Sequence, residues 1–124
     1  MPDISCETEV SERDVGGTSV LVLTLSGQLE TSTVPNLQKE TTDLIEQGNK
    51  FIVLALSGVD YVSSNGLGLL LDLHRRLDKL EGRVCLAEIT EEVRHIMKIV
   101  GFDRIFRIYD TTDEAAEACV ATDE

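Results

Sequence analysis

An uninterrupted apolar run, Phe51 to Leu56, leads after a few residues into a long leucine-rich segment, and this pairing most constrains how the chain can fold. A run of this length is typical of a strand that is buried on both faces. The leucines that follow recur at helical spacing, which predicts a helix over about 65–80 that ends near Gly82. The residues between the two elements, 57–64, are expected to form a short loop. A buried strand that leads into an amphipathic helix is the repeating unit of α/β folds.

Strand and helix patterns alternate over the rest of the chain. The predicted strands cover 4–10, 19–26, 83–87 and 105–109, with Gly27 ending the second of these, and the predicted helices cover about 34–47, 91–100 and 112–120. The resulting order, β-β-α-β-α-β-α-β-α, indicates an α/β domain whose mixed, mostly parallel sheet has helices packed on it. With 124 residues, the chain is expected to form a single domain over 1–124, with its core at about 15–120.

Helix ends and inner faces follow from capping residues and apolar spacing. The expected N-caps are one of residues 31–33, then Thr90, then Thr111 in a capping box with Glu114; the expected C-terminal glycines are Gly48 and Gly101. The predicted inner faces are Val34, Leu37, Thr41, Leu44 and Ile45 in the first helix, and Val93, Ile96, Met97 and Val100 in the third.

The charge balance limits the classes of partner. Eleven Lys and Arg against 23 Asp and Glu give a net charge of −12, which disfavours binding to nucleic acid or to anionic membranes. The three cysteines, Cys6, Cys85 and Cys119, lack metal-ligand spacing, so we expect free thiols in a reducing compartment and no metal or cofactor. A secretory signal and an apolar run of ~20 residues are both absent, which predicts a cytoplasmic protein without membrane insertion.

Two serines, Ser63 and Ser64, precede the leucine-rich helix, where free backbone N–H groups and the helix dipole favour negative charge. Three roles compete at this position: Ser64 caps the helix, a serine acts as a catalytic nucleophile, or a serine accepts a phosphate. The nucleophile is disfavoured because Gly-x-Ser-x-Gly is absent and neither histidine is well placed as a base. His74 lies roughly 15 Å along the same helix, and His95 lies in the middle of another.

Two glycines, Gly66 and Gly68, fall in the first turns of this helix. They keep bulky side chains away from the serines, which would let a kinase or a partner approach closely. Alternatively, they let the start of the helix pack tightly against the sheet. The two interpretations are compatible.

Residues 56–68, which read Leu-Ser-Gly-Val-Asp-Tyr-Val-Ser-Ser-Asn-Gly-Leu-Gly, closely resemble the serine loop of the STAS domain, the family of bacterial anti-sigma-factor antagonists. Residues 25–30 resemble the family's Leu-x-Gly-Glu-Leu-Asp, and residues 99–106 resemble a late segment with hydrophobic-x-Gly-Leu. The three segments run in the family's order, and together the resemblance covers about residues 15–120. It implies that the whole chain is one STAS-like domain.

The resemblance also implies a partner-switching function. In that mechanism the unphosphorylated antagonist binds an anti-sigma factor that is also a serine kinase, and so frees the sigma factor. Phosphorylation of a serine in the loop breaks the complex, and a serine phosphatase resets it. The family's acceptor lies two residues before the Gly of Gly-Leu-Gly, which here is Ser64, with Ser63 as the alternative. The implied partner-binding residues are Glu30, Thr31, Ser32, Ser63, Asn65, Gly66, Gly68, Asp72 and Arg75.

This chain departs from the family pattern at three of these positions. Ser63 stands where many members have Asp, Asn65 where they have a second Ser, and Glu30 where Asp is usual. Two other functions stay open: a STAS module that acts as a scaffold or transporter accessory, and a small-ligand binder at the same helix end. None of these is an enzyme, and the sequence leaves the sigma factor, the signal and the oligomeric state open.

Overall fold

The computed structural model describes residues 5–121, and within them strands and helices follow the predicted order. The elements are β1 (Cys6–Val15), β2 (Thr18–Leu29), α1 (Val34–Glu46), β3 (Phe51–Val62), α2 (Ser64–Lys79), β4 (Arg83–Ala87), α3 (Glu91–Val100), the 3₁₀ helix η1 (Phe102–Arg104), β5 (Arg107–Tyr109) and α4 (Thr112–Val120). Residue 4, where the first strand was expected to begin, lies outside the described part.

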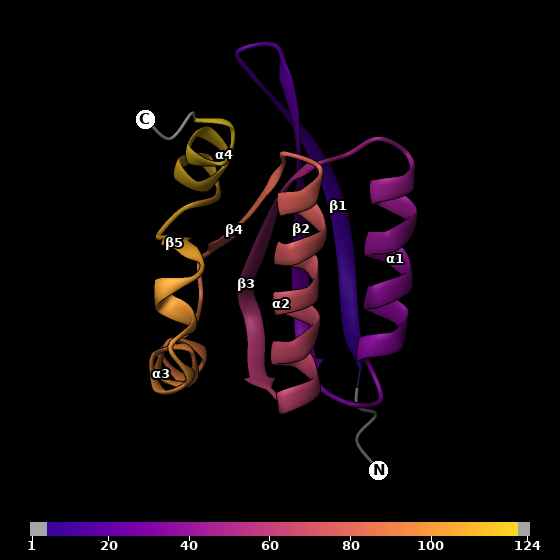
Figure 1. The fold of residues 1–124 in the computed structure, drawn as a ribbon. Coiled ribbons are helices and arrows are strands. Elements are labelled where there is room, and N and C mark those ends of the chain that lie inside the picture. The colour runs from indigo at the N-terminus through magenta and orange to yellow at the C-terminus, as the bar shows by residue number, and fades with distance from the viewer. Residues whose placement is uncertain (1–4, 122–124) are drawn as a thin grey trace.

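The five strands form one sheet in the order β1-β2-β3-β4-β5. β1 is antiparallel to β2, and the other three pairings are parallel, so the predicted mixed, mostly parallel sheet is confirmed. α1 and α2 lie side by side on one face of this sheet, and α4 packs on the other (Figure 1). Because β2 and β3 run parallel, the segments after them meet at one end of the sheet.

The two faces of the sheet carry side chains of different size. The strand residues facing α1 and α2 are mostly Leu and Ile, including Leu23, Leu54 and Leu86, all essentially inaccessible to solvent. The residues facing α4 are smaller, and they pack against Ala115, Ala116 and Cys119 of that helix. Strict alternation of large and small residues along the strands therefore sets the face on which each helix can pack.

β3 is longer than the sequence indicates, and this changes the expected loop at 57–64. Residues up to Val62 stay paired with β2, although the register shifts twice on the way. The exposed Ser57 and Gly58 break the apolar run that marks the buried part of the strand. Pairing therefore continues where apolar patterning ends, and the segment between sheet and helix is a sharp turn rather than a loop.

β1 and β2 also extend further than expected. β1 continues to Val15, and β2 continues through Gly27 to Leu29. Gly27 has a φ of +115°, and a side chain there would collide with the carbonyl oxygen of Ser5. Here glycine permits a close approach of two strands and does not end the second one.

Most helix ends agree with the sequence. Thr90 and Thr111 cap α3 and α4 through their hydroxyls, Gly101 ends α3 in the left-handed region, and Glu114 accepts a bond from the Thr111 hydroxyl. Two details were wrong. Val100, expected on the inner face of α3, is 44% exposed. Residues 102–104 form a 3₁₀ turn, so the last strand begins only at Arg107. None of the helices within residues 5–121 has the length and apolarity needed to cross a bilayer.

Candidate functional site

Ser63 is the residue that caps α2. Its backbone is extended (φ −82°, ψ 175°), and its hydroxyl accepts a hydrogen bond from the N–H of Gly66 at 3.2 Å. Its own N–H donates to the carbonyl oxygen of Leu29 at 2.7 Å, which anchors the turn to the end of β2. The expectation that Ser64 caps the helix is therefore wrong, because β3 continues to Val62 and the helix begins one residue earlier.

Ser64 occupies the first position of α2 and is exposed. Within residues 5–121 its hydroxyl forms no hydrogen bond. The backbone N–H groups of Ser64 and Asn65 likewise have no acceptor there, as is usual in the first turn of a helix. The two serines thus have different surroundings: Ser63 is half-buried and bonded, and Ser64 is presented to solvent beside free N–H donors.

The segment between β2 and α1 lies against the serine turn. The amide of Asn65 donates to the hydroxyl of Thr31 at 2.9 Å, across the gap between the two segments. Within the segment, the Ser32 hydroxyl donates to the Glu30 carboxylate at 3.1 Å. The structure therefore places these five predicted site residues, Glu30, Thr31, Ser32, Ser63 and Asn65, in two adjoining segments.

Thr33 holds this segment in place from inside. Its buried hydroxyl donates to the carbonyl oxygen of Gln28 at 2.6 Å and accepts from the N–H of Glu30 at 3.0 Å. It occupies the N-cap position of α1, as expected for one of residues 31–33, but its side chain makes no capping bond to the helix. Its hydroxyl instead closes the turn that carries Glu30, Thr31 and Ser32.

An open groove of about 270 Å³ lies between α1 and α2 beside Ser64. The residues predicted from the sequence for the site include four that line this groove, Ser64, Asn65, Gly68 and Asp72. The residues that line its α1 side were not predicted. Val34 and Gln38 line that side and are one helical turn apart on α1. Their i, i+4 spacing was visible in the sequence, but only the pairing of α1 with α2 shows that they face the serine turn.

Gly66 and Gly68 play different structural roles. A Cβ on Gly66 would lie 2.7 Å from the carbonyl oxygen of Leu29 and 3.0 Å from Val62 Cγ1, so Gly66 permits tight packing of the helix start on the sheet. A Cβ on Gly68 would meet nothing within 4 Å. Gly68 is exposed and lines the groove. Packing does not require a glycine at this position, and the missing side chain leaves the groove open there.

The charged residues of α2 also separate into two roles. Arg75 is exposed, and Asp72 lines the groove. Arg76 donates to the hydroxyl of Thr42 on α1 at 2.9 Å and lies 4.0 Å from Asp72. Arg76 therefore links the two helices, whereas Arg75 and Asp72 are presented at the surface.

Neither histidine is arranged as a base for the serines. The ring of His74 packs edge-on against Phe106 with centroids 5.4 Å apart, and His95 is exposed on α3. Within the described residues no hydrogen bond joins either ring to Ser63 or Ser64. A Ser–His–acid arrangement is thus not assembled at this turn.

These observations define the class of the domain: an α/β fold with a mixed five-stranded sheet and an exposed serine at the start of a helix. Residues 11–115 match the family described as "STAS domain", which is most of the chain. The chain belongs to the STAS domain family.

Three relatives illustrate the similarity. The chain is 30% identical to BtrV of Bordetella bronchiseptica, provisionally named an anti-sigma factor antagonist, over 80% of this chain and 85% of that protein. It is 26% identical to the anti-sigma F factor antagonist of Paenibacillus polymyxa, over 73% of this chain and 79% of that one. The crystal structure of an anti-sigma factor antagonist from Mycobacterium paratuberculosis superposes with a TM-score of 0.77 at 25% identity, covering 93% of this chain and 96% of that one.

Proposed function

We propose that this protein is an anti-sigma-factor antagonist that is switched by phosphorylation of Ser64. The observation that carries the proposal is the difference between the two serines: the Ser63 hydroxyl is bonded to Gly66 as a cap, whereas the Ser64 hydroxyl is exposed and without a partner within residues 5–121. A kinase must reach its acceptor hydroxyl, and Ser64 meets that requirement without any rearrangement of the turn.

The surface that docks the partner is the serine turn, the adjoining segment 30–32 and the groove between α1 and α2. Its partner is an anti-sigma factor that is also a serine kinase, and a serine phosphatase restores the unphosphorylated form. All of these residues lie at or near one end of the sheet, and Gly68 keeps the groove open. The names of the relatives support this assignment, and the protein is then a bacterial cytoplasmic regulator without catalytic activity, cofactor or nucleic-acid ligand.

Phosphorylation acts on the complex through charge. A phosphate adds about −1.5 to −2 charges and three acceptor oxygens. At Ser64 it would border the same groove as the carboxylate of Asp72, on a chain whose net charge is already −12. A partner that fits the neutral hydroxyl would have to desolvate this charge, which costs binding free energy unless it offers cations at that point.

The test compares two single variants with the unmodified protein. Each is incubated with ATP and the anti-sigma-factor kinase that binds it, and intact mass reports phosphate incorporation. Ser64→Ala is expected to take up no phosphate, whereas Ser63→Ala is expected to take up one. Phosphate on Ser64→Ala but not on Ser63→Ala would refute the assignment of the acceptor.

A second measurement tests the switch itself. Ser64→Glu is expected to bind the kinase at least about tenfold more weakly than Ser64→Ala, equivalent to about 1.4 kcal/mol. The neutral variant controls for loss of the hydroxyl, so the difference reports charge alone. Equal binding by both variants, or binding that does not release a sigma factor, would favour a scaffold role in place of the antagonist role.

A further inference from the structure

A second surface, remote from Ser64 in sequence, stands out by its charge. Residues 94–107 hold four of the eleven basic residues and only one acidic residue, whereas elsewhere acids outnumber bases 22 to seven. The four cations, Arg94, Lys98, Arg104 and Arg107, come from α3, η1 and β5. A strongly acidic protein thus carries a stretch in which basic residues predominate.

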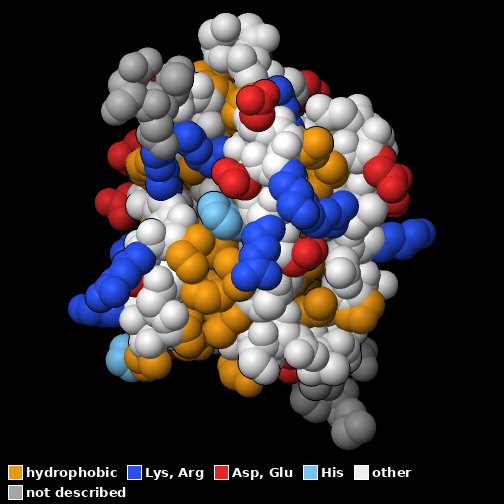
Figure 2. Space-filling model, in the orientation of Figure 1, with side chains coloured by type: hydrophobic (Ala, Val, Ile, Leu, Met, Phe, Trp, Pro, Cys, Tyr) orange, Lys and Arg blue, Asp and Glu red, His pale blue; other side chains and the backbone are white. Residues whose placement is uncertain are grey.

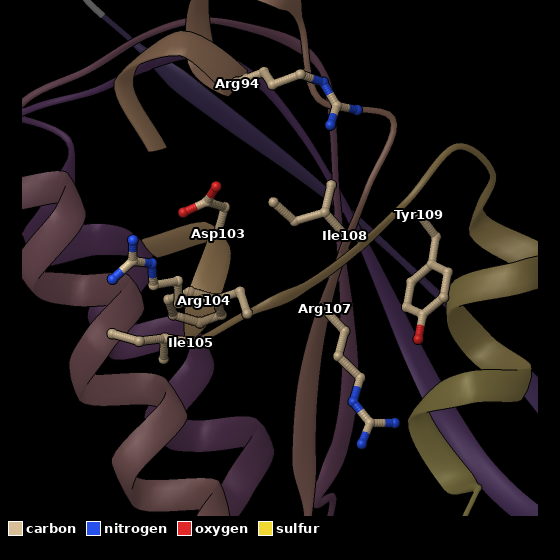
Figure 3. A pocket seen from close by; sticks show the side chains of 8 residues that line it. Arg94, Asp103, Arg104, Ile105, Arg107, Ile108 and Tyr109 are labelled. Atoms are coloured by element: carbon tan, nitrogen blue, oxygen red, sulfur yellow. The ribbon is translucent and has the colours of Figure 1, made fainter. Parts of the chain in front are cut away.

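Three of these cations, Arg94, Arg104 and Arg107, line an open groove of about 520 Å³ that runs along β5. Figure 3 shows Arg94, Arg104 and Arg107 arranged around it, each from a different element, with Ile108 between them and Ile105 next to Arg104. Within residues 5–121, Arg94 and Arg104 form no salt bridge, even though Asp103 lines the same groove. Cations that are not neutralised internally attract an anionic partner.

Apolar side chains adjoin the cations. A second groove of about 410 Å³ shares Asp103 and Arg104 with the first, and it is lined by Ile99 and Val100, which are 70% and 44% exposed. Ile105, which lines the first groove, is 42% exposed. On the face that carries α2 and α3, exposed apolar side chains gather in the lower half of Figure 2. A surface that combines cations with exposed aliphatic residues is suited to a protein segment rather than to a small anion.

β5 adds a backbone feature. It is the last strand of the sheet, and within the described residues it pairs only with β4. All three of its residues line the larger groove. An edge strand of this kind can pair with an added extended segment, whose alternate side chains then point to opposite sides.

We propose that the groove along β5 binds an extended acidic segment of a partner protein, which pairs with β5, places carboxylates near Arg94 and Arg104, and packs apolar side chains on Ile105. This surface shares no lining residue with the groove beside Ser64. It gives the protein a second contact that phosphorylation of the serine turn leaves in place. The basic charge on this edge also opposes pairing of two β5 edges from two copies.

The test uses a short fluorescein-labelled peptide in which Glu and Val alternate, with fluorescence anisotropy as the readout. A peptide of equal charge in which Pro replaces Val is the control for backbone pairing, because Pro lacks the N–H donor. The protein variants are Arg94→Glu/Arg104→Glu and, as a matched control, Arg75→Glu/Lys79→Glu. Both double variants change the net charge equally, but the second pair lies on α2.

The Glu–Val peptide is expected to bind with a dissociation constant below about 1 mM at low salt, and at least about tenfold more weakly to Arg94→Glu/Arg104→Glu. The α2 variant is expected to bind within about twofold of the unmodified protein, and the Glu–Pro peptide at least about tenfold more weakly. Absence of saturable binding, equal losses in both variants, or equal binding of both peptides would each overturn the proposal. So would self-association that Arg94→Glu/Arg104→Glu abolishes, because the occupant would then be a second copy.

Discussion

Alanine substitutions at Gly66 and Gly68, in the first turns of α2, are expected to change the free energy of unfolding in opposite directions. Gly68 lies within α2, is exposed, and would place a Cβ in open space. Glycine in a helix costs roughly 0.5–1 kcal/mol relative to alanine, because the unfolded chain loses more freedom on folding. Gly68→Ala is therefore expected to raise the free energy of unfolding by about that amount.

Gly66→Ala gains the same entropic term but meets a steric barrier. Its Cβ would lie 2.7 Å from a backbone oxygen, that of Leu29, which cannot move without disturbing β2. Overpacking of this kind typically costs about 1–3 kcal/mol, which exceeds the gain. Gly66→Ala is therefore expected to lower the free energy of unfolding, although the substitution is chemically identical to the one at Gly68.

Urea unfolding followed by circular dichroism measures both effects on one scale, and thermal melts provide a second scale. We expect the Tm to rise by about 2–5 °C for Gly68→Ala and to fall for Gly66→Ala. If the partner occupies the groove, Gly68→Ala also weakens kinase binding while stabilising the protein. Destabilisation by Gly68→Ala equal to that by Gly66→Ala would refute the reasoning, because the space at Gly68 would not be open.

Two further predictions concern the caps and the thiols. Ser63→Ala is expected to lower the free energy of unfolding by about 1 kcal/mol through loss of the cap to Gly66, whereas Ser64→Ala changes it little; equal losses in urea titrations would contradict the assignment of the cap. A hydrogen bond with Cys85 and burial raise the pKa of Cys119, so its thiol stays protonated in the folded state. The stability that the protonated thiol provides is present below the unfolded pKa of ~8.5, and this stability is lost as pH rises above that value. Burial also raises the pKa of the half-buried Cys6, so a disulfide reagent is expected to label Cys6 more slowly than free cysteine at pH 8, and Cys85 and Cys119 only on unfolding.

The order of elements could be predicted because each carries its own local signal. The strand over 83–87 and the caps at Thr90 and Thr111 agree with the structure to the residue. Strand ends were predicted less well. Residues 57–62 lack an apolar pattern, and their pairing with β2 depends on a neighbour far away in the sequence. Local patterning marks where a strand is buried, not where its hydrogen bonds stop.

The same limit explains what was missed at the candidate site. The sequence marked both serines, but which of them caps the helix depends on where β3 ends, so the cap was placed on Ser64 instead of Ser63. The α1 side of the groove, Val34 and Gln38, required the packing of two helices on one face. The basic groove along β5 was visible in outline as a run of cations over 94–107. Only the fold shows that this groove lies along an edge strand of the sheet, where a partner segment could pair.

The proposed phosphorylation of Ser64 would leave the domain folded, as the structure of the serine turn indicates. The N–H groups of Ser64 and Asn65 have no acceptors among residues 5–121, and Ser63 already caps Gly66. A phosphate on Ser64 would therefore find donors and a favourable helix dipole, worth about 0.3–1 kcal/mol at an exposed site. Since the modification does not oppose the helix, its effect must fall on whatever contacts the turn. A site that tolerates both charge states at nearly constant stability is what a reversible switch of partner binding requires.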